Sequence, residues 1–147
     1  MMDFEQFFHK ELYMLCRKYG LKTLKWWDRT YALVGPDYII LFSGDSSGVV
    51  ILEYIRRDPQ GNLKIWDIGW YFGTKAEDQD RADLLPRRTI VDGWKNNTRV
   101  LARVLDRCGS KLLPGGNQWM EDYLRSEYSF VPHDVAGPHR EQAEKYI

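Results

Sequence analysis

Apolar residues dominate the middle of the chain, where three runs are separated by short polar segments. The runs are Tyr38–Phe42, Val49–Arg57 and Asn62–Phe72, and the separators read SGDSSG and DPQGN. In the second separator, Pro59 suits the second position of a tight turn and Gly61 suits a position that needs a positive φ. The pattern therefore predicts a β-hairpin that closes with a glycine bulge.

The turn sets which residues of the predicted hairpin lie opposite each other. With Asp58 opposite Asn62, one face places Val50, Leu52 and Tyr54 across from Trp70, Ile68 and Trp66. On the other face, Glu53 lies directly across from Asp67. Like charges directly opposite each other destabilise a sheet. This carboxylate pair therefore breaks an apolar pattern and supplies the candidate catalytic residues, Glu53 and Asp67.

The flanking segments predict further strands and helices. Leu21–Trp27 and Thr30–Val34 are rich in aromatic and β-branched residues, which favour strands. Asp3–Tyr19 and Arg88–Cys108 carry apolar residues at three- and four-residue spacing, which is typical of amphipathic helices. The sequence predicts an α+β fold, with an antiparallel meander of four or five strands and the helices packed on one face.

The C-terminal part of the chain is more broken. Gly115 and Gly116 interrupt the pattern, and a short third helix is predicted after Asn117. The chain has 147 residues, which suits one domain. We expect this α+β domain to span residues 1–130. Residues 131–147 are polar and contain Pro and Gly, and they are predicted to form a tail that is partly loose or ends in one helical turn.

Composition limits the classes of function. Lys plus Arg and Asp plus Glu both number 21, giving a net charge of +0, which argues against a non-specific nucleic-acid binder. No apolar run reaches the roughly 20 residues needed to span a bilayer, and the N-terminus lacks the features of a signal peptide. We therefore expect a cytoplasmic protein with no membrane partner. Cys16 and Cys108 cannot form a zinc site without histidines, and no cofactor motif is present, so no metal or cofactor is predicted.

Four interpretations of Glu53 and Asp67 remain open. Two close carboxylates can divide acid and base roles, because both cannot ionise cheaply together. They can also provide oxygen ligands for Mg²⁺ or Ca²⁺, with Asp45 as a third ligand. Alternatively, they share an arginine of the same chain, for which the candidates are Arg29, Arg56, Arg57, Arg87 and Arg88. The fourth interpretation is that both carboxylates are simply exposed to water.

A long polar segment offers a second candidate surface. Gly73–Arg87 mixes both charges, and connections of this length are often functional or mobile. A solvated linker is the simpler interpretation, and a lid or partner-contact segment is the functional one. The predicted partner-binding residues are Asp45, Glu53, Asp67, Lys75, Glu77, Asp78 and Asp80.

The aromatic content favours a binding function. The six Trp and nine Tyr are too many for one small core, so we expect at least one Trp at the surface, where Trp is favoured in protein interfaces. A helix, an antiparallel meander and two further helices resemble many small bacterial accessory proteins, toxin-neutralising immunity proteins among them. The function predicted is binding to a protein partner, as an inhibitor or immunity-like protein. The alternative is a small metal-dependent hydrolase that uses the carboxylate pair.

Overall fold

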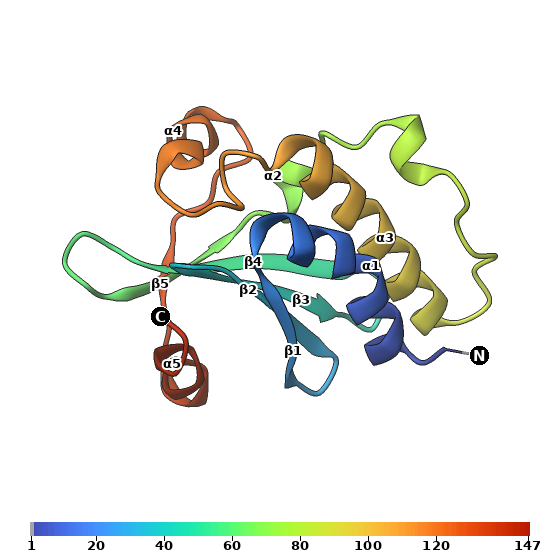
Figure 1. Ribbon diagram of the computed structural model, residues 1–147, viewed down its shortest axis with the longest axis horizontal. Coiled ribbons are helices and arrows are strands. Elements are labelled where there is room, and N and C mark those ends of the chain that lie inside the picture. The colour runs from blue at the N-terminus through green and yellow to red at the C-terminus, as the bar shows by residue number, and fades with distance from the viewer. Residues whose placement is uncertain (1) are drawn as a thin grey trace.

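The computed structural model describes residues 2–147, which form an antiparallel sheet with helices on both sides (Figure 1). The elements in chain order are α1 (Phe4–Tyr19), β1 (Lys22–Trp27), β2 (Thr30–Val34), β3 (Tyr38–Gly44), β4 (Val50–Arg57), β5 (Leu63–Asp67), α2 (Gly69–Gly73), η1 (Asp78–Arg81), α3 (Ile90–Cys108), α4 (Gln118–Arg125), β6 (His133–Asp134) and α5 (Gly137–Glu144). The strands lie in the sheet in the order of the chain. The predicted α+β antiparallel fold is confirmed, although the sheet has six strands rather than four or five.

The first face of the sheet carries the larger core, and α1, α3 and α4 lie on that side in Figure 1. Local sequence explains where α1 begins and ends. Asp3 and Gln6 form a capping box, and Gly20 ends the helix in the left-handed conformation. Aromatic side chains fill the centre, with the Tyr54 and Trp119 rings 4.8 Å apart in an edge-to-face arrangement. Within residues 2–147, no helix is long and apolar enough to cross a membrane.

The opposite face carries a second, smaller core that is completed by the C-terminal segment. β6 pairs with β5, and α5 lies on the side of the sheet away from α1 and α3 (Figure 1). Val135 and Ala143 are buried there against residues of β2, β3 and β4. The side chain of Trp26 donates to Nδ1 of His139 at 3.1 Å. The sequence predicted that residues 131–147 form a tail that is partly loose or ends in one helical turn, and the structure shows that they contribute the strand β6 and the eight-residue helix α5.

The central hairpin has the predicted register, but β5 is shorter than expected. Asp58 N donates to Asn62 O, and Glu53 lies directly opposite Asp67. The predicted pairing of Trp70 with Val50 is wrong, because the chain leaves the sheet after Asp67 and enters α2. The carboxylate of Asp67 accepts from Gly69 N at 3.0 Å, and this local turn ends the strand.

Two glycines allow α3 to approach the β3–β4 turn closely. A Cβ atom on Gly93 would lie 2.5 Å from the carbonyl oxygen of Gly48, and one on Gly44 would lie 2.5 Å from the ring of Trp94. The Trp94 indole then donates to Asp45 O at 2.8 Å. This contact sets the distance between α3 and β4, and therefore the width of the groove described below.

We expect Gly93→Ala to lower the free energy of unfolding by about 1–3 kcal/mol, because its methyl group meets a rigid backbone carbonyl. Alanine is the better helix former, so propensity alone predicts the opposite sign. Gly73→Ala is the matched control, since no atom lies within 4 Å of a Cβ built there. Its stability should be unchanged or slightly raised. Urea unfolding of both variants decides, and equal stabilities would contradict the close approach of α3.

Candidate functional site

The most prominent candidate site lies where β5 separates from β4. Ile68 N still donates to Leu52 O at 3.0 Å, but the strand ends there and α2 begins. At the first residue of β4, the Val50 amide donates instead to the side chain of Asn97 on α3, at 3.2 Å. On the edge that faces away from β3, the early part of β4 is thus flanked by α3 and α2 rather than by β5. This separation opens a groove between them.

The groove has a volume of about 540 Å³ and is mostly apolar in its lining. Four large apolar side chains on its walls are notably exposed: Trp70 by 64%, Val49 by 44%, Ile51 by 42% and Leu84 by 36%. The groove also includes Asp67 from β5 and Arg81 from η1. An exposed apolar surface with polar groups beside it is typical of an interaction site.

One member of the predicted carboxylate pair lines this groove. Asp67 lines it, and Glu53 is the cross-strand neighbour of Asp67. The hydrogen bond to Leu52 O makes Glu53 and Asp67 a non-hydrogen-bonded pair, the type whose Cα atoms approach to about 4.5 Å. Burial, and then the charge of Asp67, raise the pKa of the Glu53 carboxyl, while His133 partly opposes this.

Among residues 2–147, neither carboxylate has a lysine or arginine as an ion-pair partner. Neither Glu53 nor Asp67 forms an ion pair there, so the structure does not support the interpretation in which the two share an arginine of the same chain. The nearby candidates have other partners: Arg56 pairs with Asp37 at 3.1 Å, and Arg87 donates to Ser47 O. The two carboxylates can accept hydrogen bonds, but no lysine or arginine among residues 2–147 forms an ion pair with them.

Asp45 has a local structural role. Its carboxylate accepts from the Ser47 amide at 2.8 Å, from the Ser47 hydroxyl at 2.7 Å and from Val49 N at 3.0 Å. These hydrogen bonds, led by the one from the Ser47 hydroxyl, lower the pKa of Asp45. Across the described part of the chain, no group of three or more His, Cys, Asp or Glu side chains is arranged to hold a metal ion.

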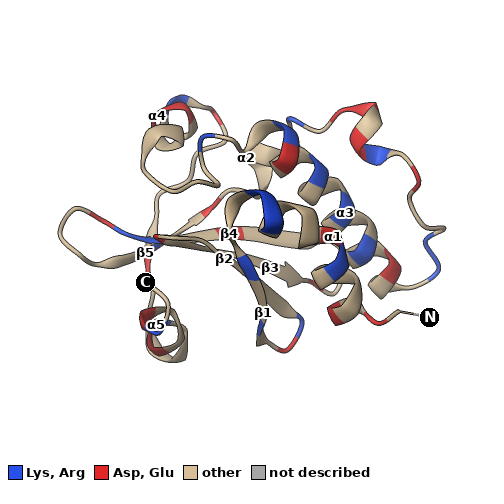
Figure 2. Ribbon diagram, viewed as in Figure 1, with Lys and Arg blue, Asp and Glu red and all other residues tan. Residues whose placement is uncertain are grey.

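The long segment after α2 is fixed to α3 by a row of arginines. Arg99, Arg103 and Arg107 are four residues apart on α3, so they lie on one side of the helix. Figure 2 shows basic positions along α3 and acidic positions in the segment beside it. Arg107 pairs with Glu77 at 3.2 Å and also with Asp80, whose side chain is buried. Neither the lid nor the solvated-linker interpretation of the segment included these contacts. The four-residue spacing of the arginines, however, is visible in the sequence.

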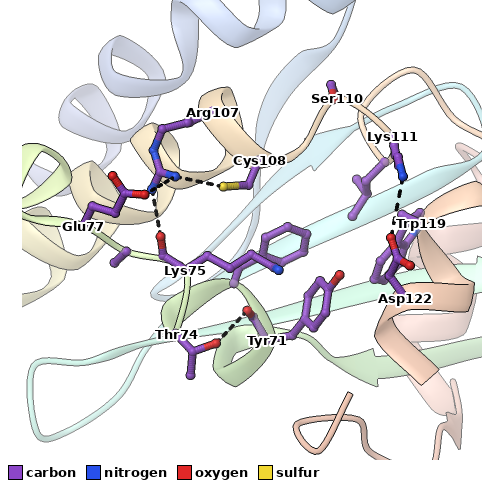
Figure 3. Close-up of a pocket in the computed structure, with 13 residues that line it drawn as sticks. Tyr71, Thr74, Lys75, Glu77, Arg107, Cys108, Ser110, Lys111, Trp119 and Asp122 are labelled. Atoms are coloured by element: carbon purple, nitrogen blue, oxygen red, sulfur yellow. Dashed lines mark hydrogen bonds and ion pairs between the residues drawn. The ribbon is translucent and has the colours of Figure 1, made fainter. Parts of the chain in front are cut away.

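The remaining predicted partner-binding residues are spread around this segment. Asp78 and Glu77 are exposed, whereas the buried carboxylate of Asp80 cannot be reached by a partner. Lys75 lies in a second pocket, of about 510 Å³, between α2, the end of α3 and α4 (Figure 3). The structure brings Glu53 and Asp67 together, but it places Asp45 and the segment residues in separate local roles.

The second pocket differs from the groove in that its cations have partners within the chain. Lys75 Nζ lies 4.5 Å from the centre of the Tyr71 ring, and Lys111 pairs with Asp122 at 3.7 Å, as Figure 3 shows for the ion pair. Arg107 is held by Glu77 and Asp80. In the groove, by contrast, Asp67 has no ion-pair partner among residues 2–147.

Asp80→Ala should destabilise the fold by about 1–3 kcal/mol, because it leaves Arg107 and the Glu77 amide without a shared acceptor. Asp78→Ala removes the same charge from an exposed position in the same segment and should change stability by less than about 0.5 kcal/mol. Thermal melts of the two variants make the comparison. Equal losses would show that the arginine row does not fix the segment.

Glu53→Gln should stabilise the protein at neutral pH by about 0.2–1 kcal/mol, because it removes repulsion between opposed like charges. The raised pKa of Glu53 in the folded state means that the wild type loses stability as pH rises from the ordinary glutamate range through the folded pKa. The gain from Glu53→Gln should therefore vanish at acidic pH. Urea unfolding at pH 4 and pH 7.5 measures it, and a gain equal at both values would contradict the assignment.

The groove and its carboxylates must be interpreted from their own chemistry. In comparisons with known proteins, no protein family, no curated protein and no solved structure matches this chain. No residue role is therefore carried over from a relative, and the α+β fold class alone does not specify an activity.

Proposed function

We propose that this protein acts by binding a protein partner at the groove between β4, α2 and α3. The observation that carries the proposal is the gathering of exposed apolar side chains there. Among residues 2–147, eleven large apolar side chains are exposed, and four of them line this one groove, with Trp70 the most exposed of the four. Scattered exposed apolar residues are ordinary, but a gathered set is typical of an interface.

Trp70 is the expected anchor of the interface. A tryptophan supplies a large apolar area together with one hydrogen-bond donor, which is why Trp is enriched among residues that dominate binding energy. The short helix α2 presents it beside the groove, and the same lining includes Ile51 of β4 and Val49, the residue just before β4. Because β4 is held within the sheet, its backbone is already ordered, and binding there carries a small cost in conformational entropy.

Inhibition of the partner, as by a toxin-neutralising immunity protein, is the specific form of this proposal. Two features support it: the small size of the chain and the groove whose apolar side chains are exposed. The hydrolase alternative requires a third ligand or catalytic group beside Glu53 and Asp67, and the best candidate, Asp45, is occupied by its own turn. A cytoplasmic location remains part of the proposal.

Trp70→Ala should abolish retention of the partner while leaving the fold intact, because the side chain is mostly exposed. The test compares tagged wild type with this variant in affinity purification from a cytoplasmic extract of the source cells. Tyr13→Ala on α1 is the matched control, since Tyr13 is also an exposed aromatic residue. With the purified partner, Trp70→Ala should weaken binding by about 30-fold or more, the scale of a dominant interface residue.

A protein that is retained equally by the wild type and by both variants would place the interface elsewhere and would overturn the role of this groove. Thermal melts confirm that each variant is folded. If nothing is retained by the wild type at stoichiometric level, the binding proposal itself fails.

A further inference from the structure

We infer that the partner inserts an arginine side chain against Glu53 and Asp67, next to Trp70, with an apolar side chain in the adjoining groove. This inference rests on the proposed binding function and names the chemistry of the partner. It starts from a mismatch of charge: the structure sets two carboxylates directly across from each other on β4 and β5, and no Lys or Arg of residues 2–147 pairs with either.

At two other sites in the chain, a buried or partly buried carboxylate is paired with an arginine. Asp80 is paired with Arg107, and Glu11 is paired with Arg99 at 2.9 Å, in both cases with side chains that are largely buried. A partly buried carboxyl group without a cation carries an unrecovered desolvation cost, which is the main reason that the pKa of Glu53 is raised. A cation from a partner would offset this cost. The positive charge that complements the two carboxylates would therefore come from the partner and be present only in the complex.

Two features favour arginine over lysine. The guanidinium group is a planar fork that can donate to two carboxylate oxygens at once, whereas the ammonium of lysine is a point charge that is more strongly hydrated. The exposed indole of Trp70 lies in the same groove lining as Asp67, and arginine also stacks well on an aromatic face. The apolar wall formed by Val49, Ile51 and Leu84 calls for an apolar residue beside that arginine in the partner.

The experiment uses two short capped peptides, Ac-Leu-Arg-Leu-NH2 and the same peptide with citrulline in place of arginine. Citrulline keeps the shape of the side chain but removes its charge. Each peptide is titrated into the ¹⁵N-labelled full chain at pH 7.5. The arginine peptide should shift the Trp70 indole signal and the amide signals of Ile51 and Asp67. The citrulline peptide should bind about tenfold more weakly, because it cannot form charge-assisted hydrogen bonds.

Charge variants make the test specific. In Glu53→Gln combined with Asp67→Asn, the two peptides should bind equally. The matched control is Glu121→Gln combined with Asp122→Asn, which removes the same charge from α4, where both acids are exposed. This control should keep the preference for arginine. Binding of the arginine peptide should also lower the pH at which the Glu53 carboxyl titrates, followed by its ¹³C signal, and a merely structural role for Glu53 would not produce that shift.

Three results would overturn the inference: no shift of the Trp70 indole with the arginine peptide, equal affinity for arginine and citrulline in the wild type, or an arginine preference that survives Glu53→Gln and Asp67→Asn. These results are distinguishable from failure of the proposed function. If Trp70→Ala still abolishes retention of the partner while arginine and citrulline peptides bind alike, the groove is an interface but the carboxylates do not recognise arginine.

Discussion

The burial of β3 on both of its faces is the constraint on which the rest of the structure depends. Five consecutive residues, Tyr38–Phe42, are buried, with alternate side chains in the two cores. A strand of this kind is stable only when material covers both sides of the sheet. The helices α1 and α3 cover one side. The other side has to be covered by a different part of the chain, and the C-terminal segment provides that cover through β6 and α5.

This constraint explains which parts of the fold the sequence could predict. The strands and the two long helices follow from apolar periodicity and from capping residues such as Asp3 and Gly20, and all of these act over short distances along the chain. The C-terminal segment was predicted to be partly loose because its local sequence is polar and rich in Pro and Gly. The continuous apolar run in β3 was a signal that a second cover was needed, but it did not say which segment would provide it.

At the candidate site, too, the sequence predicted one feature and missed another. The opposed pair of Glu53 and Asp67 followed from one turn, because hairpin register is set locally. The groove did not follow, since it depends on the early end of β5, and an apolar run can continue as a strand or enter a helix with little change in composition. Trp70 was therefore expected inside the sheet and is instead largely exposed on α2. Only the contact of α3 with the β3–β4 turn reveals that an open groove results.

The arginine row on α3 has a consequence for how this protein can change over evolutionary time. Several of its hydrogen bonds go to main-chain carbonyl groups: Arg99 donates to Asp83 O at 2.6 Å, Arg103 to Asp80 O at 3.1 Å and Arg107 to Lys75 O at 2.8 Å. Carbonyl oxygens are present whatever side chain a residue carries. Most side chains of the segment can therefore be replaced without altering its path. Because Leu84 and Arg81 of this segment line the groove, new partner preferences can arise there by substitution while the scaffold keeps its shape.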